Sequence, residues 1–209
     1  MFNRILAVAP HADDIEFGCS GSLSRFIREG SEVYYLVFSI CEEWVPKGFR
    51  ENILKEEATE SAKILGIKEN NVNIYHFRAT ELWKKREEIF NILEKINNDF
   101  IPDCVFCHAG TDLHQDHHTI FKEVSRVFKR STVLGYEMPW NNIKFVSNFH
   151  VSLQRQDVEK KIEALKKFKS QFHRKYLDEE LIYSIARMRG IQIREMFAEA
   201  FEVIRAVIK

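Results

Sequence analysis

The first residues suited to chemistry in this 209-residue chain are His11, Asp13 and Asp14, which follow the apolar run of residues 4–9. Adjacent carboxylates repel each other unless a cation or a proton lies between them. His11 and Asp14 are three residues apart, so one turn of chain can bring both around one metal ion. Asp13 then points elsewhere and can accept a proton from water. The alternative without chemistry is that both aspartates cap a helix and His11 is an ordinary loop histidine.

A second polar cluster, residues 112–118, reads Asp-Leu-His-Gln-Asp-His-His and follows the apolar run of residues 104–108. Three of the eight histidines of the chain fall within it, which is more than a solvated loop requires. A catalytic zinc ion takes three protein ligands and leaves a fourth position for water. His11, Asp14 and one histidine of this cluster would supply such a set. Spacing alone leaves the third ligand open among His114, His117 and His118.

The elements that must position these clusters follow an alternating pattern. Short apolar segments alternate with longer amphipathic ones, which predicts βαβ units and a mostly parallel sheet in an α/β, Rossmann-like, three-layer fold. The carboxyl ends of parallel strands form one edge, where ligands bind. We expect strands at residues 4–9, 32–39, 72–77, 104–108 and 132–137, and helices at 18–30, 50–65, 81–98 and 117–129.

The second half of the chain is less regular. It predicts a late strand at residues 149–153 and helices over 158–172, 177–189 and 195–208. The sequence contains no repeat and no linker rich in proline or glycine. We therefore expect the C-terminal helices to complete a single domain of residues 1–209.

The composition of the chain limits the classes of partner that the protein is expected to bind. Lys and Arg number 31 and Asp and Glu number 31, so the formal net charge is zero. Such a chain has no basic field to gather the phosphates of nucleic acid or an anionic membrane surface. No run reaches the roughly 18 apolar residues of a membrane span, and the N-terminus turns polar too early for a signal peptide. We predict a cytoplasmic protein with no nucleic-acid or membrane partner, and the sequence is compatible with a homo-oligomer.

The chain has four cysteines, too few for a disulfide framework in a chain of this length. Cys104 and Cys107 are expected on one strand. Residues three apart on a strand point to opposite faces, so these two cannot pair. Buried free thiols are the expected outcome.

Together the two clusters resemble the zinc-dependent deacetylases of the PIG-L family, also called LmbE-like. The family pattern is His-Pro-Asp-Asp after the first strand and His-Pro-Asp-His later, and here residues 11–14 and 114–117 stand in those places. Residues 15–18 are similar to the bacillithiol-biosynthesis branch. Further similarities to the family lie at residues 57–58, 65–66, 170–171 and 198–201.

The resemblance implies a role for each polar residue. The implied zinc ligands are His11, Asp14 and His117. Asp13 would be the general base, His114 the general acid and oxyanion partner, and Asp116 the residue that tunes His114. The implied substrate is an N-acetylated amino sugar or sugar conjugate, hydrolysed to acetate and a free amine. Zn²⁺ rests on the resemblance, because two histidines and one carboxylate also suit Fe²⁺.

Some positions depart from the family pattern and affect the expected substrate contacts. A substrate-binding arginine of the family aligns with Leu54, and Arg50, four residues earlier on the expected helix face, is the candidate replacement. Phe197 stands where a tyrosine is usual, so a hydroxyl near the site is expected to be missing. Trp44 and Trp140, in loops after strands, are candidates to stack on a sugar ring, with core packing as the equal alternative.

Two other interpretations use the same residues. Asp116, His117 and His118 spell a motif of two-metal phosphoesterases, but those enzymes also need an Asp-x-Asp arrangement near the N-terminus, where this chain has His11 and Asp13. A metal-binding partner protein without catalysis is the second alternative. Neither Asp13 nor His114 is needed merely to hold an ion, which argues for an enzyme.

Overall fold

The first strand is buried on both faces, and this determines the layering of the molecule. The computed structural model describes residues 2–174 and 177–208. Within β1 (Arg4–His11), Ile5 and Ala7 belong to one hydrophobic core, whereas Leu6 and Val8 belong to another. A strand with a core on each face needs helices above and below it.

The described residues form one seven-stranded sheet in the order β3-β2-β1-β4-β5-β7-β6. Each neighbouring pair from β3 to β5 is parallel, and β7 is antiparallel to both β5 and β6. The other strands are β2 (Glu32–Ser39), β3 (Val72–Ile74), β4 (Cys104–His108), β5 (Thr132–Tyr136), β6 (Phe149–Leu153) and β7 (Phe197–Arg205).

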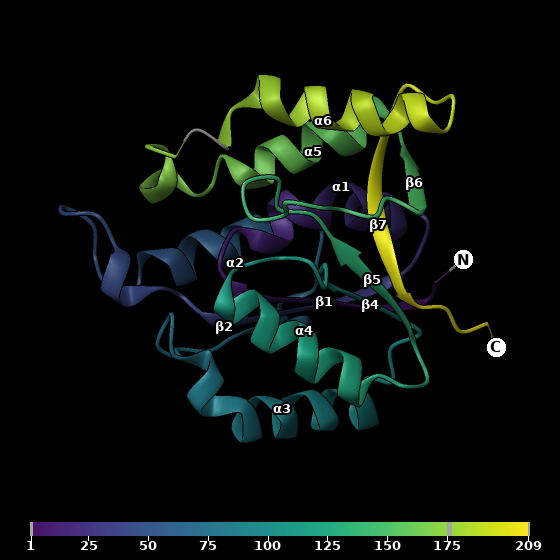
Figure 1. Ribbon diagram of the computed structural model, residues 1–209. Helices are drawn as coiled ribbons and strands as arrows, with labels where there is room; N and C mark the ends of the chain where they lie inside the picture. Colours follow the sequence, from purple (N-terminus) through teal and green to yellow (C-terminus); the bar gives the residue numbers. More distant parts are fainter. Residues whose placement is uncertain (1, 175–176, 209) are drawn as a thin grey trace.

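Helices cover both faces of the sheet. Figure 1 shows α3 and α4 on one side and α5 and α6 on the other. One core includes residues of α1 (Asp14–Arg28), α2 (Ile53–Leu65), α5 (Arg155–Leu165) and α6 (Glu179–Gln192), and the other includes residues of α3 (Arg86–Asp99) and α4 (Gln115–Val127). Short 3₁₀ helices are η1 (Glu42–Trp44), η2 (Glu69–Asn71), η3 (Leu82–Lys85) and η4 (Lys169–Gln171). The α/β three-layer fold predicted from the sequence is therefore confirmed.

The C-terminal segment differs from the sequence expectation. Residues 195–208 were expected to be helical, but Phe197–Arg205 is the strand β7 between β5 and β6. Its alanines and glutamates favour a helix in isolation, and burial between two strands overrides that preference. The helix expected over residues 158–172 ends at Leu165, and the strand expected over 72–77 ends at Ile74.

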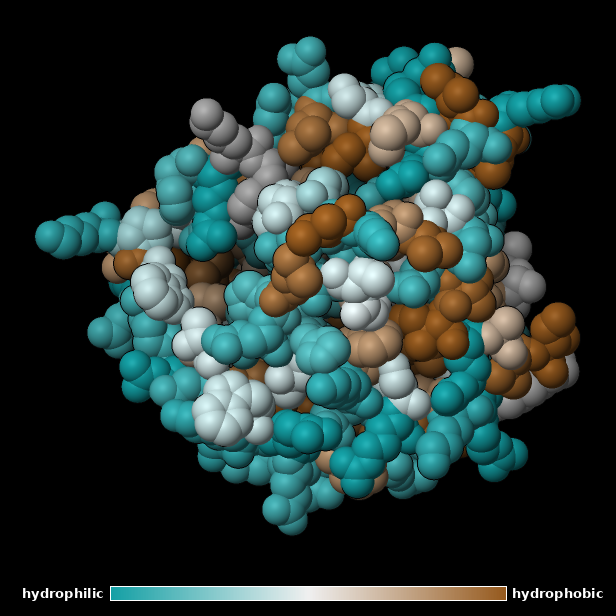
Figure 2. Space-filling model, viewed as in Figure 1, coloured by the Kyte–Doolittle hydropathy of each residue, from teal (hydrophilic) through white to brown (hydrophobic). Residues whose placement is uncertain are grey.

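The cysteines and the surface agree with the composition. Cys104 and Cys107 lie on β4, face opposite cores and are free, as their spacing predicts. The face shown in Figure 2 is mostly hydrophilic, with apolar groups scattered between the polar ones. None of the described helices is long and apolar enough to cross a membrane.

A buried ion pair joins the C-terminal elements to α1. The Glu199 carboxylate on β7 accepts hydrogen bonds from the backbone amides of Gly21 (3.1 Å) and Ser22 (2.6 Å). Lys161 of α5 donates to Glu199 at 2.6 Å and also to the carbonyl oxygen of Phe17. The exposed fractions of the two charged side chains are 9% and 8%. The pair therefore anchors the helix that carries the first polar cluster.

Lys161→Met is expected to lower the free energy of unfolding by about 3–5 kcal/mol, because it leaves the Glu199 carboxylate buried without its cation. Adding Glu199→Gln should recover part of that loss. The measurement is urea unfolding followed by circular dichroism. Lys166→Met is the matched control, since Lys166 forms an exposed pair with Glu179, worth about 0–1 kcal/mol. Equal losses at Lys161 and Lys166 would contradict the anchoring role.

Candidate active site

The two polar clusters lie at one edge of the sheet. β1 is flanked by β2 and β4, so the chain leaves β1 on one side and returns on the other. In an open α/β sheet the ligand crevice lies at the carboxyl ends of such strands. His11 is the last residue of β1, Asp14 is the first residue of α1, and residues 112–118 follow β4 into α4. Parallel pairing thus brings together residues about a hundred positions apart.

Three donor atoms converge in this crevice. His11 Nδ1 lies 3.3 Å from Asp14 Oδ2 and 3.3 Å from His117 Nε2. His117 Nε2 lies 3.6 Å from Asp14 Oδ2. Donors bound about 2.0–2.1 Å from a tetrahedral zinc ion lie about 3.3 Å from one another. The triangle of donors therefore has the size that such an ion requires.

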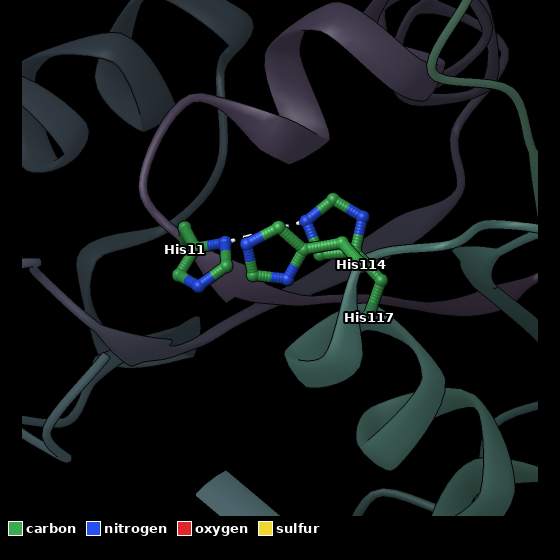
Figure 3. Close-up of side chains that lie close together, drawn as sticks. All are labelled: His11, His114 and His117. Atoms are coloured by element: carbon green, nitrogen blue, oxygen red, sulfur yellow. Dashed lines mark hydrogen bonds between the residues drawn. The ribbon is translucent and has the colours of Figure 1, made fainter. Parts of the chain in front are cut away.

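His114 belongs to the same group but is bonded differently. Figure 3 shows its ring beside His117 at the start of α4, with His11 coming from the end of β1. Its Nδ1 accepts a hydrogen bond from the backbone amide of Asp116 at 3.1 Å and so caps α4. In the neutral ring the proton therefore lies on Nε2, which becomes a hydrogen-bond donor. This arrangement suits contact with a substrate oxygen better than binding of a metal.

Buried carboxylates orient both histidines of the donor triangle. Asp116 Oδ2 lies 2.9 Å from His11 Nε2, and Asp112 Oδ2 lies 2.7 Å from His117 Nδ1. Each ring is thus held through one nitrogen while the other faces Asp14, an arrangement typical of metal-ligating histidines. The sequence predicted that Asp116 acts on His114. Its backbone amide does donate to His114 Nδ1, and its charge favours the protonated form of that ring, while its carboxylate contacts His11 and the amide of Thr80 (2.6 Å).

Asp112 was part of the second cluster but had no role in the sequence analysis. Its other oxygen, Oδ1, accepts a hydrogen bond from the His114 amide at 2.8 Å. One carboxylate thus holds both the ring of His117 and the turn that precedes α4. The available signal was its position within a cluster rich in histidine, but spacing does not distinguish a ligand from a residue that orients one.

The protonation states of His117 and Asp14 suit a cation. Burial and the neighbouring His108 lower the pKa of His117 to about 4, so the ring is neutral at neutral pH. Burial alone would raise the pKa of Asp14, but His117 and His108 beside it hold the pKa well below its ordinary value. A neutral imidazole and a charged carboxylate are the forms that bind metal ions. Burial alone would lower the pKa of His11, but the acidic groups of Cys41, Asp116 and Asp14 hold it well above its ordinary value, so this ring must lose a proton when it binds a metal.

Asp13 occupies a strained backbone position. Its φ is 80°, in the left-handed region that aspartate tolerates better than most residues. It precedes α1 in the N-cap position, yet its side chain makes no capping hydrogen bond. The capping alternative is therefore not supported for Asp13. Backbone strain of this kind concentrates at functional sites, where it directs a side chain.

These residues open onto a cavity of about 440 Å³, which is within the range of small-molecule sites. The wall includes His11, Asp13, Asp14, His114 and His117. The remaining lining residues are Ala12, Cys41, Trp44, Leu54, Ala79, Thr80, Trp140, Asn141, Gln171 and Arg174. Both tryptophans suggested by the sequence therefore border the same space as the donor triangle.

Arg50 is not part of this cavity. The helix α2 begins at Ile53, so Arg50 lies before it and does not share a helical face with Leu54. Its exposed guanidinium pairs with Glu56 at 2.5 Å. The arginine on the cavity wall is Arg174, which the sequence analysis did not single out.

Phe197 and His118 also lie apart from the cavity lining. Phe197 is buried on β7 with its ring near Tyr183, and it is not among the residues that line the cavity. His118 is exposed and stacks on Phe121. Its position does not favour the phosphoesterase interpretation, which requires the motif of residues 116–118 to act together.

Comparison with known proteins is consistent with the site. Residues 6–128 match the family described as PIG-L, GlcNAc-PI de-N-acetylase. The chain belongs to the PIG-L family. This PIG-L protein is also 30% identical over 173 residues to YaiS of Escherichia coli (strain K12), an uncharacterized deacetylase, and the match covers 79% of this chain and 90% of YaiS.

Solved structures share the fold of this PIG-L protein at lower identity. The N,N′-diacetylchitobiose deacetylase of Pyrococcus horikoshii is 22% identical with a TM-score of 0.78, over 97% of this chain and 84% of that one. GalB, the 4-carboxy-2-hydroxymuconate hydratase of Pseudomonas putida KT2440, is 18% identical with a TM-score of 0.81, over 99% and 98%. Since a deacetylase and a hydratase share this architecture, the fold alone does not define the reaction.

Asp112→Asn is expected to weaken zinc binding about 10–100-fold, because it removes the charge that orients His117 while keeping the side-chain shape. The measurement is the zinc dissociation constant from competition with a coloured chelator. Asp99→Asn, at an exposed position near the end of α3, is the control and should leave the constant unchanged. Unaltered zinc affinity in Asp112→Asn would remove Asp112 from the site.

Proposed function

We propose that this PIG-L protein is a metal-dependent hydrolase that removes the N-acetyl group from an amino-sugar derivative, giving acetate and a free amine. The observation that carries the proposal is the triangle of His11, Asp14 and His117 donors, 3.3–3.6 Å apart. Asp13 and His114 border the same cavity. A site that only stored an ion would need neither of them.

The donor set fits a zinc ion in size and chemistry. His11, Asp14 and His117 would hold it, and two imidazoles with one carboxylate suit Fe²⁺ as well. A zinc ion held by these residues would polarise the amide carbonyl and would lower the pKa of a water molecule to about 7. The protein's own side chains then have two tasks, which are to move the proton of the attacking water and to stabilise the oxygen of the amide.

Asp13 is the group suited to move the proton. Its carboxylate accepts the proton as water attacks the amide carbon, and the same proton then passes to the departing nitrogen, which must be protonated to leave. The resemblance assigned this second step to His114. However, His114 Nδ1 accepts a hydrogen bond from the Asp116 amide. Burial, and to a smaller extent the nearby His11, lower the pKa of His114. A neutral His114 suits donation from Nε2 to the developing oxyanion.

The cavity supports a sugar as the substrate. Trp44 and Trp140 provide indole rings on its wall, and a sugar ring has an apolar face that packs on such a ring. Gln171 and Arg174 offer hydrogen-bond donors for hydroxyl groups. Among the relatives, the diacetylchitobiose deacetylase of Thermococcus kodakarensis is 30% identical over 124 residues, which cover 54% of this chain and 45% of that protein.

His117→Ala should remove both bound zinc and activity, because two protein ligands hold a catalytic ion poorly. Metal content per chain, measured by mass spectrometry after dialysis, and acetate release are the two readouts. His118→Ala is the matched control and should retain both. A reversal of the two results would show that the wrong histidine has been assigned.

Asp13→Ala and His114→Ala should keep the metal and lose activity for different reasons. Loss of a proton-transfer group costs typically about 10²–10⁴-fold, and loss of an oxyanion donor about 10²–10³-fold in kcat. The pH profile separates the roles. Asp13→Ala should lose the acidic limb, whereas His114→Ala should keep the shape of the profile at a lower rate. Loss of the alkaline limb in His114→Ala would restore the general-acid role.

N-acetylglucosamine glycosides should be hydrolysed faster than acetyl-lysine peptides at equal concentration, because the cavity wall provides both indole rings and polar groups, which suit a sugar ring. Release of acetate from mixtures of the two, resolved by mass spectrometry, measures the preference. Trp140→Ala should raise KM for the glycosides. Faster hydrolysis of the peptides would reject the sugar, and hydrolysis of neither would indicate another acyl amine.

A further inference from the structure

A further histidine, His108, lies beside the donor triangle and has no role in the proposed reaction. It is the last residue of β4 and its side chain is fully buried. Neither of its ring nitrogens has a hydrogen-bond partner among the described residues. Burial of an imidazole without partners is unfavourable. A packing role alone would be filled equally well by an apolar ring.

The Asp14 carboxylate lies beside the ring of His108, and an apolar ring at this position could not interact with it. His108 Nε2 lies 3.6 Å from Asp14 Oδ2, and its ring centroid lies 3.7 Å from that of His117. Asp14, His108 and His117 offer donor atoms that all lie within 4.8 Å of one another. His117 has its Nδ1 on Asp112, so Nε2 is the atom it can offer. Asp14 and His117 therefore belong both to the donor triangle and to a second, inner group, which they form with His108.

We propose that His108 is a reserve metal ligand, which can replace His11 so that Asp14, His108 and His117 hold the ion at a second, inner position. This inference rests on the metal-binding part of the proposed function. His11 borders the cavity, whereas His108 is absent from its lining. An ion at the inner position is therefore farther from the substrate space. The inner donors are again two imidazoles and one carboxylate, so both positions suit the same metals.

The test combines His11→Ala, His108→Phe and the double variant with zinc as the probe. His108→Phe keeps a buried ring and removes no hydrogen bond. Each single variant should retain about one zinc ion per chain after dialysis, because the other histidine completes the set. The double variant should lose it. The loss of affinity in the double variant should exceed the product of the two single losses by roughly tenfold, measured by chelator competition.

X-ray absorption on the zinc-loaded proteins counts the imidazole ligands directly. Wild-type protein and His11→Ala should each show two, with His108 replacing His11 in the variant. His108→Leu is the second variant at this position if His108→Phe does not fold, as judged by circular dichroism. His76→Ala is the control, since His76 is exposed and pairs with Glu42, and it should change neither zinc content nor ligand count.

Three results would overturn the proposal. His11→Ala that loses zinc as fully as the double variant would show that His108 cannot take over. Loss of zinc in His108→Phe alone would make His108 a principal ligand, and three imidazoles in the wild type would make it a permanent one. These outcomes are separate from failure of the proposed function, which would appear as wild-type protein that binds zinc but releases no acetate.

Discussion

The central physical constraint is the concentration of buried charge where β1 and β4 end. Asp14, Asp112 and Asp116 are all buried within hydrogen-bond or ion-pair reach of the histidines. A buried carboxylate is costly unless a proton, a cation or several hydrogen bonds compensate it. Asp112 and Asp116 obtain this from imidazoles and backbone amides. Asp14 Oδ2 accepts the His11 amide and lies near three imidazole rings, and it is the carboxylate of the donor triangle.

The rest of the fold can be understood as holding this cluster in register. Parallel pairing of β1 with β4 brings the two clusters to one edge. Asp13 has a left-handed backbone, whereas Asp14 is the first residue of α1, so the two adjacent acids have different backbone conformations, as the separate roles proposed for them require. The ion pair of Lys161 and Glu199 connects α1 to α5 and β7 through hydrogen bonds to the backbone of α1. The position of Glu199 among residues similar to the family is thus explained by its contact with the helix that begins at the metal donors.

Fold and chemistry carry different information here. The hydratase GalB shares the architecture over nearly the whole chain, so the sheet order and the layers are compatible with more than one reaction. The local arrangement favours amide hydrolysis. The donor triangle, Asp13, whose side chain does not cap α1, and His114, which can donate from Nε2, all border one cavity. The reserve ligand proposed here, His108, is buried and is not among the residues that line the cavity, so a substrate in the cavity would not contact it.

The sequence by itself determined the layers, the edge that carries the site, and the residues of the two clusters. These depend on local features, namely apolar runs, alternation, and unusual density of histidine and aspartate. Only the tertiary structure decided which polar group faces which. Spacing could not separate His117 from His118, because helical phase depends on where α4 begins. Spacing also could not show that the Asp116 carboxylate contacts His11, which depends on where α4 begins. It could not show that Arg50 lies outside the cavity, which depends on where α2 begins.

The C-terminal strand β7 shows the same limit. Its residues favour a helix, and only the gap between β5 and β6 makes a strand of them, because backbone groups buried there must pair with both neighbours. The cavity wall beyond the motifs, including Gln171 and Arg174, is likewise assembled from segments far apart in the chain. Local sequence therefore predicts which residues can do chemistry, and packing decides which of them meet.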